Sequence, residues 1–554
     1  MAFLSKEHDM SVKDKVSSPQ AQRFREQYED LRHTMTKAAL PAEAVAFSID
    51  GRVFGFEVPV SQSIRVGAYV TINTDSGIEY LGQITSQEIG IREGPEYGLK
   101  FNAETQLMMI TKSTAESNFV ERVRLRYVHG RGELIGRVTQ NGIERATDQD
   151  VFEQATLKLA STDTIALHLS TSQKELPGLD IGYSLGAQKG KARVQLQPKG
   201  FRRHTFMCGQ SRSGKTFALG VILEQILLSE TAQRLIIIDP NSDFVRLNEL
   251  LTKKEHDDKR HEKRTDDEFA AIKKRYEEIL PAIRILRPYA GDPLRIRLSD
   301  LNRYEQGAVL QLHPIHDLQA FNSFAKVIEG LGEHLYSWEV INNRLSKEFS
   351  ASAVDLALRI QNLSVSDWDV WCKTEEPSIT QQLMRDDWRF MVVDVGTLAS
   401  AEQRAVANLA VLNYLWKTKN RETPVLLVLD EAHNICPFEP STPMEEIATD
   451  YVIRIAGEGI KYGLRLLLAS QRPAKIHPNV LTQCENLVLM RMNSKADLEG
   501  LSPIFSQVDP ALLAQARYFV QGESLIVGEI VKSPTFAKFE GRITREGGGD
   551  APNV

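Results

Sequence analysis

One segment of the sequence has the residue types and spacing of a phosphate-binding loop. Gly209-Gln-Ser-Arg-Ser-Gly-Lys-Thr216 fits the pattern GxxxxGK followed by Ser or Thr at every fixed position. A short buried strand, His204–Cys208, is predicted before it, and a helix, Phe217–Ser229, after it. Backbone N–H groups of such a loop face phosphate oxygens, and the helix N-terminus adds the positive end of its dipole. The segment therefore predicts an ATP site.

Two side chains of this loop have the chemistry that the phosphates and a metal ion require. Lys215 is expected to reach the β- and γ-phosphates, and Thr216 to hold Mg²⁺ through its hydroxyl. The residues expected to bind the nucleotide are Gly209, Gln210, Ser211, Arg212, Ser213, Gly214, Lys215, Thr216 and Phe217.

A second segment runs from five apolar residues, Val425–Leu429, directly into two carboxylates. A buried strand of this kind places Asp430 and Glu431 at its carboxyl end, where ligands of parallel sheets bind. Asp430 suits the water shell of Mg²⁺, and Glu431 suits polarisation of an attacking water. This glutamate favours hydrolysis over phosphoryl transfer to another substrate.

Two further strand ends carry polar residues that could lie beside the same crevice. Gln471 follows the apolar run Leu466–Ala469, so its amide is expected to contact the γ-phosphate and to report its loss. A strand that simply ends in a polar turn would give the same pattern. Asp239 and Asp243 follow the apolar run Leu235–Ile238, a signal that is weak by itself.

These side chains must be positioned by strands that end at one edge of a sheet. The second half of the chain alternates helical stretches with continuous apolar runs, and such runs are typical of a parallel sheet covered on both faces. The sequence therefore predicts an α/β fold. The runs are Leu235–Ile238, Phe390–Val393, Val425–Leu429, Leu464–Ala469 and Leu487–Met490.

The N-terminal part has a different period. Apolar residues alternate from Ala42, with turn signals at Asp50-Gly51 and Asp75-Ser-Gly77, which predicts a small β-barrel. Before it, Phe24, Tyr28, Leu31 and Met35 form a helical stripe, and Arg122, Arg124 and Arg126 share one face of a strand. The arginine face could contact nucleic acid or a partner protein, or could be solvated beside acidic residues.

The chain therefore divides into parts of different character. The expected parts are an N-terminal helical tail at 1–41, the barrel at 42–140, a connector at 141–178, an ATPase domain at 179–540 with a charged helical insertion at about 250–345, and a disordered tail at 541–554.

Length and composition exclude several classes of protein. The chain has 554 residues, which is too many for one core, and a hydrophobic fraction of 42%, which excludes overall disorder. Lys and Arg number 67 against 73 Asp and Glu, a net charge of −6, so any DNA-binding channel must be a local basic region. Four cysteines without CxxC spacing and the lack of an apolar membrane span predict a cytoplasmic protein.

Taken together, several segments resemble the HerA-type ATPases, within the HerA/FtsK group of RecA-like motors. The resembling segments are GQSRSGKT, IIIDPNSDF, MVVDVGTLASAEQRAVANLAVL, VLDEAH and RIAGEGIKYGLRLLLASQRP, and the likeness spans about residues 42–540. It implies a RecA-like core, a small N-terminal barrel and a hexameric ring around double-stranded DNA. It also implies ATP hydrolysis that drives translocation, with an effector such as a nuclease, in DNA processing or defence against phage.

The resemblance also implies two arginine roles. Arg454 stands in the place of the arginine finger that reaches a neighbouring subunit's ATP, and Arg203 matches a second arginine of the family. Lys461 is an alternative finger, in which case Arg454 would cap a helix.

Two other functions remain open on the sequence. One is a scaffold ring that controls an effector with little translocation of its own, and the other is a secretion- or conjugation-type motor. No nuclease constellation is visible, and His433 and His477 are expected to be structural. The effector is therefore expected to be another protein, docked on residues 1–140.

Overall fold

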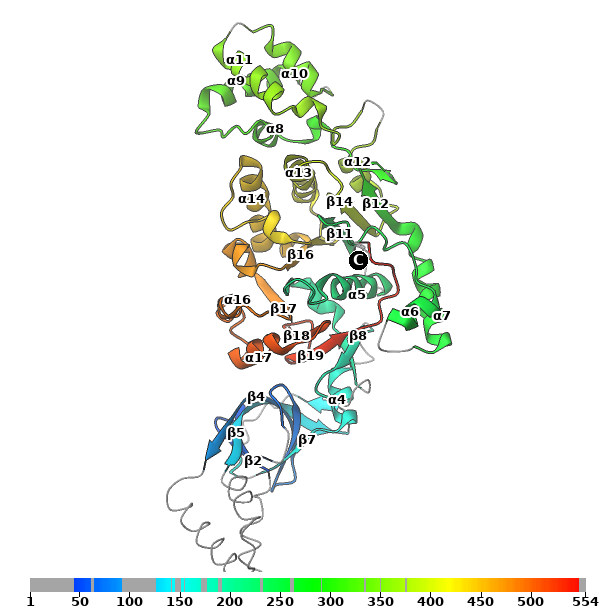
Figure 1. The fold of residues 1–554 in the computed structure, drawn as a ribbon, viewed down its shortest axis with the longest axis vertical. Helices are drawn as coiled ribbons and strands as arrows, with labels where there is room; N and C mark the ends of the chain where they lie inside the picture. Colours follow the sequence, from blue (N-terminus) through cyan, green and yellow to red (C-terminus); the bar gives the residue numbers. More distant parts are fainter. Residues whose placement is uncertain are drawn as a thin grey trace, which may run out of the picture. The chain divides into compact units, whose positions relative to one another are not determined.

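The computed structural model forms two compact units, Met1–Ala160 and Ser161–Val554 (Figure 1). The structure describes residues 44–60, 64–91, 126–140, 142–144, 151–153, 155–170, 177–187, 192–229, 233–259, 264–289, 291–332, 335–348, 350–373 and 376–547. The expected helix with the stripe Phe24–Met35 and the residues Arg122 and Arg124 lie outside these ranges.

The N-terminal unit contains a closed barrel of six strands, which confirms the predicted barrel. Neighbouring strands pair in the order β2-β1-β7-β3-β4-β5, the pairing of β2 with β5 closes the ring, and β6 extends it beyond β5. Alternate side chains such as Phe54, Phe56, Val70 and Ile72 fill the interior. The strands are β1 (Val45–Ser48), β2 (Val53–Pro59), β3 (Tyr69–Thr74), β4 (Glu79–Ile91), β5 (Arg126–Thr139), β6 (Gly142–Glu144) and β7 (Ala155–Leu159).

The barrel extends beyond the boundary expected from the sequence. Strand β7 lies in the range expected to be a connector, yet it pairs with both β1 and β3 and is needed to close the ring. Only Ala155 and Leu157 of its five residues are buried, so the alternation of apolar residues was too short to predict a strand. Helix α4 (Thr162–Leu169) follows in the second unit.

The second unit is built on a twelve-stranded sheet, which confirms the predicted α/β class. Its strand order is β13-β12-β14-β11-β15-β16-β10-β17-β18-β19-β8-β9, parallel as far as β17 and antiparallel beyond it. All five apolar runs form strands. The bounds are β10 (His204–Cys208), β11 (Arg234–Asp239), β14 (Phe390–Asp394), β15 (Val425–Leu429), β16 (Leu464–Ser470), β17 (Cys484–Met490), β18 (Glu523–Val527), β19 (Thr535–Phe539), β8 (Leu179–Ser184) and β9 (Arg193–Leu196).

Helices cover both faces of the parallel part. Helix α5 (Lys215–Leu228) connects β10 to β11 in one direction along the sheet, whereas α13 (Ala401–Thr418) and α14 (Pro443–Glu458) make connections in the opposite direction. Because such crossovers are right-handed, α5 lies on one face, and α13 and α14 lie together on the other. Short helices complete this layer: α15 (Pro478–Leu481), α16 (Lys495–Leu501) and α17 (Pro510–Ala514).

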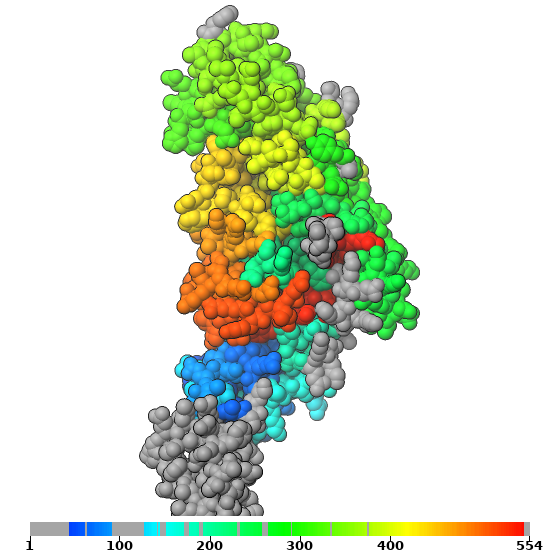
Figure 2. Space-filling view, in the orientation of Figure 1, coloured from blue at the N-terminus to red at the C-terminus, as the bar shows by residue number. Residues whose placement is uncertain are grey.

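The region expected to be one charged insertion is two separate structures. Helices α6 (Lys253–Lys259) and α7 (Asp266–Glu277) precede β12 (Ile283–Arg287) and β13 (Asp292–Pro293), which extend the main sheet. A helical lobe follows, and Figure 2 shows it as the green surface at the top of the view. The lobe consists of α8 (Arg303–Val309), α9 (Leu318–Leu331), α10 (Trp338–Leu345) and α11 (Ala351–Asn362), and α12 (Ile379–Met384) leads back to the sheet.

The expected disordered tail at 541–554 is wrong for residues 541–547, and 548–554 lie outside the described ranges. Arg542 is fully buried, with its Nε 3.7 Å from Oε1 of Glu224 on α5. The backbone N–H groups of Ile543 and Thr544 donate to the same carboxylate at 3.0 Å. The polar composition of this segment suggested a tail. The sequence alone does not show that the segment binds a buried carboxylate more than 300 residues away.

None of the described helices is both long enough and apolar enough to cross a membrane.

Candidate active site

The phosphate-binding loop joins β10 to α5 and has the backbone geometry that its glycines permit. Gly214 precedes the first turn of α5 with a φ of 94°, and Arg212 also has a positive φ of 61°. A Cβ at Gly209 would lie 2.7 Å from the hydroxyl of Ser213, so only glycine fits there. The backbone N–H of Gly522 donates to the carbonyl of Ser213 at 2.8 Å, so the turn before β18 supports the loop.

Lys215 lies in a buried cluster with the two carboxylates that follow β15. Its Nζ donates to Oδ1 of Asp430 at 3.0 Å and to Oε1 of Glu431 at 2.7 Å. Burial alone would lower the pKa of Lys215, but the two carboxylate charges outweigh it and raise the pKa. Lys215 is therefore a buried ammonium stabilised by Asp430 and Glu431, the two acids that the sequence predicted for this site.

Glu431 has one oxygen engaged and one without a hydrogen bond. Burial would raise its pKa, but the charge and hydrogen bond of Lys215 together with the hydrogen bond from Gln471 outweigh burial and lower the pKa, so Glu431 is ionised. Nε2 of Gln471, which follows β16, donates to Oε1 at 2.7 Å. Oε2 is buried without a hydrogen-bond partner among the described residues. The structure thus brings Lys215, Glu431 and Gln471 together at the carboxyl ends of adjacent strands.

Thr216 has an additional acidic neighbour. Its Oγ1 donates to Oδ2 of Asp243 at 3.3 Å, and burial, followed by the charge of Asp430, raises the pKa of Asp243. The carboxylate of Asp239 at the end of β11 accepts the backbone N–H groups of Asn241, Asp243 and Phe244. Of the two acids that follow the apolar run of β11, Asp239 therefore holds the loop in place, and Asp243 belongs to the site.

The oxygen donors here fit a hard cation of the Mg²⁺ type. Thr216, Asp243 and Asp430 supply a hydroxyl and carboxylates, and Mg²⁺ in phosphate sites takes one or two protein carboxylates and completes its shell with water and phosphate. The described residues contain no group of three or more His, Cys, Asp or Glu side chains that could hold a metal ion by themselves. The residues present therefore fit a cation shared with nucleotide phosphates.

His433 belongs to the site, although the sequence indicated a structural role. Its Nδ1 lies 3.4 Å from Oε2 of Glu431 and 3.0 Å from Oγ of Ser470, the last residue of β16. Burial lowers the pKa of His433 despite the charge of Glu431, so the imidazole is neutral near pH 7. Its position three residues after Asp430 was the available signal. His477 accepts the backbone N–H of Asn479 at the start of α15, a structural contact.

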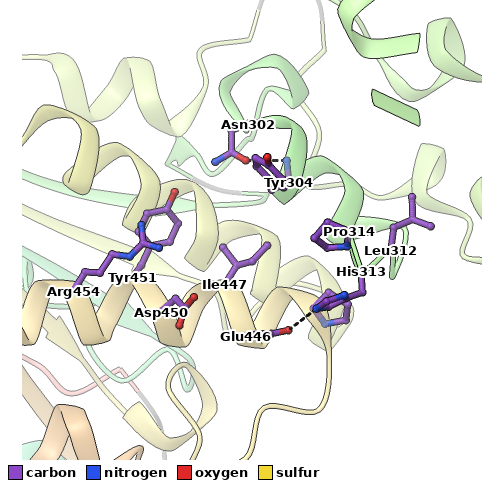
Figure 3. A pocket seen from close by; sticks show the side chains of 11 residues that line it. Asn302, Tyr304, Leu312, His313, Pro314, Glu446, Ile447, Asp450, Tyr451 and Arg454 are labelled. Atoms are coloured by element: carbon purple, nitrogen blue, oxygen red, sulfur yellow. Dashed lines mark hydrogen bonds and ion pairs between the residues drawn. The ribbon is translucent and has the colours of Figure 1, made fainter. Parts of the chain in front are cut away.

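The two arginines of the expected trans interaction lie away from this cluster. Arg454 is exposed on α14 and lines a cavity of about 270 Å³ between α14 and the start of the helical lobe (Figure 3). It lies inside the helix, and among the described residues it donates no hydrogen bond that would cap a helix end. Arg203 is half-exposed and pairs with Glu485 at 3.1 Å. Lys461 is also exposed, in the turn Gly459–Tyr462.

Comparisons with known proteins find similar sequences among HerA helicases. The family model "Helicase HerA, central domain" matches residues 179–323. The "DNA double-strand break repair helicase HerA" of Sulfurisphaera tokodaii is 24% identical over 529 residues, which cover 86% of this chain and 94% of that protein. A probable helicase of Methanocaldococcus jannaschii is 31% identical over 134 residues, and the match spans 25% of its length.

Among solved structures, VirB4 of Thermoanaerobacter pseudethanolicus matches with a TM-score of 0.44 and 16% identity, over 66% of this chain and 96% of that chain. The chain is therefore similar to the HerA-type ATPases in its phosphate loop and paired carboxylates, in the segment that the family model matches and, at low identity, over most of its length.

Proposed function

We propose that this chain hydrolyses ATP to move double-stranded DNA through a ring of six copies in the cytoplasm. The observation that carries the proposal is the buried cluster of Lys215, Asp430, Glu431 and Gln471 at one edge of the sheet. Such a cluster can bind phosphates, hold a cation and activate water, whereas no other part of the described chain combines these groups.

The loop Gly209–Thr216 would hold the phosphates of ATP through its backbone N–H groups. Lys215, whose Nζ lies 3.0 Å from Asp430 and 2.7 Å from Glu431, would then exchange these contacts for phosphate oxygens. Mg²⁺, held by Thr216 and Asp430 with Asp243 nearby, would neutralise part of the phosphate charge.

Release of Lys215 leaves Glu431 as the general base. Its Oε2 is the oxygen without a hydrogen bond, so it can orient a water and accept its proton. Gln471 holds Oε1 at 2.7 Å and fixes the direction of the carboxylate, and His433 lies beside Oε2. Loss of the γ-phosphate would alter the contact between Gln471 and Glu431. Because Gln471 directly follows β16, this change would be transmitted to that strand.

Arg454 is proposed to act in a neighbouring subunit's site, with Arg203 as a second cation near the same interface. The support is that Arg454 is exposed and lies outside its own cluster, so it is available to another chain. A cation brought to the γ-phosphate in this way stabilises the charge that develops during transfer.

The effector is proposed to dock on residues 1–140, because the described part of the chain shows no second catalytic centre. The name of the Sulfurisphaera relative points to repair of double-strand breaks, and defence against phage is the other setting proposed. Deleting residues 1–160, which removes the whole barrel including β7, should abolish effector binding and leave ATP binding, with ring size measured in parallel. Unchanged effector affinity in an assembled truncated protein would refute this site.

The motor proposal is tested by ATP hydrolysis with and without double-stranded DNA, together with displacement of a third strand from a DNA triplex. We expect DNA to stimulate turnover and triplex displacement to require ATP. The Glu431→Gln variant is the control and should do neither. ATP turnover that DNA leaves unchanged, with no displacement, would instead support the scaffold ring.

A further inference from the structure

A second cavity, of about 770 Å³, lies outside the nucleotide site, where the helical lobe meets the segments on either side of it. Residues from three parts of the chain line it: Tyr289 and 295–298 after β12, 335–340 at the start of α10, and 366–373 after α11. Its size is in the range of cavities that enclose a drug-sized molecule or a few residues of a peptide. None of its lining residues belongs to the nucleotide cluster.

Aromatic rings dominate this cavity, and we call Trp338, Trp368 and Trp371 its tryptophan cluster. The rings of Trp368 and Trp371 stack with centroids 6.0 Å apart and planes 4° apart, and Trp338 meets Trp371 edge to face at 6.0 Å. Tyr289 and Tyr336 complete the aromatic lining. Rigid aromatic surfaces contribute large contact area at low entropic cost, which is why they dominate binding sites for other proteins.

One polar group in the cluster lacks an acceptor. Trp368 and Trp371 donate their indole N–H groups to the carbonyls of Leu363 and Val365 at 3.2 and 2.6 Å. Trp338 is only 1% exposed, and its Nε1 has no hydrogen-bond partner among the described residues. Nε1 has almost no accessible surface, so a molecule in the cavity does not reach it.

The charges around the cavity favour a basic ligand over a nucleic acid. Arg295 is paired with Glu376 at 3.2 Å, and Arg297 donates to the carbonyl of Glu376 at the same distance. The lining charges without an ion pair among the described residues are two cations, Arg297 and Lys373, and three carboxylates, Glu339, Asp367 and Asp369. The acids are in excess, so phosphate groups would be repelled, whereas lysine or arginine side chains would be attracted to Glu339 and Asp367.

The apolar lining continues onto the surface, which argues for a macromolecule over a small molecule. Tyr289 is 67% exposed, Leu335 66% and Val340 42%, and all three line the cavity. A small molecule would fill the interior and leave these side chains in water. An extended chain that crosses the mouth would cover them as well.

We propose that this cavity binds an extended peptide segment of a partner protein. In this segment a large apolar side chain packs on the tryptophan cluster, and an adjacent lysine or arginine pairs with Glu339 or Asp367. The inference does not rest on the proposed motor function, because the cavity shares no residue with the nucleotide site.

The test selects peptides from a random phage-displayed library on the full-length protein. Leu335→Lys places a charge at the mouth without touching the core, and Val354→Lys on α11 is its matched control, because Val354 is 58% exposed and does not line the cavity. Synthetic peptides from the selection are then titrated while tryptophan emission is followed. Three of the chain's five tryptophans lie in the cluster, so emission reports occupancy.

We expect the selected peptides to share an apolar residue next to Lys or Arg. Leu335→Lys, and likewise the pair Glu339→Lys and Asp367→Lys, should weaken binding at least about tenfold, which corresponds to about 1.4 kcal/mol. Val354→Lys should leave binding unchanged. ATP turnover should be unchanged in all of these variants.

Three results would overturn the proposal. The first is a selection whose peptides bind the Leu335→Lys and wild-type proteins equally or that yields no peptide. The second is binding of a labelled single-stranded DNA that competes with the selected peptides, which would assign the cavity to nucleic acid. The third is a change in oligomeric state in Leu335→Lys, which would assign this surface to contact between copies of the chain.

Discussion

At the scale of single residues, the site is defined by how the two oxygens of Glu431 are used. One oxygen accepts from Lys215 and Gln471, and the other is left for a water. The sequence predicted these three residues because strand ends in a parallel sheet meet at one edge. It could not predict the role of His433, because the contact with Ser470 depends on the relative height of two strand ends.

The Glu431→Gln variant should bind ATP with near wild-type affinity and hydrolyse it at least about 100-fold more slowly, because an amide cannot accept the proton of the attacking water. Single-turnover hydrolysis and a fluorescent ATP analogue measure the two quantities. His433→Asn is the comparison variant and should lose less activity. Turnover of Glu431→Gln within a few-fold of wild type would exclude Glu431 as the base.

Asp239 should make stability depend on pH. Burial raises its pKa from 3.8 to about 7, so between these values the native state holds a proton that the unfolded state releases. This contribution to stability is complete below pH 3.8 and is lost as the pH rises through about 7. The Asp239→Asn variant should therefore show a smaller fall in urea midpoint across this window, and an unchanged slope would contradict the assignment.

At the scale of elements, the nucleotide helix depends on the chain's last described segment. Arg542 touches Glu224 on α5, its Nη1 donates to the carbonyl of Thr216 at 3.4 Å, and its guanidinium leaves no space for a Cβ at Gly220. The apolar runs were sufficient to predict the strands. The packing of residues 541–547 could not be predicted, because it is a polar, long-range contact with no periodic signal.

Ending the chain after Glu540 should destabilise the protein by about 3–5 kcal/mol, because Glu224 would remain buried without its partner. Ending it after Gly547 should have no effect. Urea unfolding of the two truncated proteins gives the comparison. The double variant Glu224→Gln with Arg542→Met should recover most of the loss seen in Arg542→Met alone, because the neutral amide oxygen still accepts from Ile543 or Thr544. Failure to recover would mean that packing rather than charge is responsible.

At the scale of the whole molecule, each proposed active site requires two copies of the chain. Subunits with Glu431→Gln and subunits with Arg454→Ala should each be inactive alone. In random mixed rings at equal ratio, about one interface in four joins an intact Glu431 to a neighbour's intact Arg454, so about a quarter of wild-type turnover should return.

The Lys461→Ala variant is the matched control for this mixing experiment, because Lys461 is the other exposed cation proposed as the finger. It should hydrolyse ATP normally by itself. Mixed rings that regain no activity, although native mass spectrometry shows both subunits in them, would place Arg454 outside the neighbour's site.

The contact between Glu224 and residues 542–544 also sets when the protein can mature during synthesis. Helix α5 leaves the ribosome long before the segment that neutralises its buried carboxylate, since 320 residues separate Glu224 from Thr544. The nascent chain therefore cannot complete its ATP site until residues 542–544 have left the exit tunnel. A chain interrupted before these residues would carry every catalytic residue but an unfinished nucleotide helix, which proteases can distinguish from the finished product.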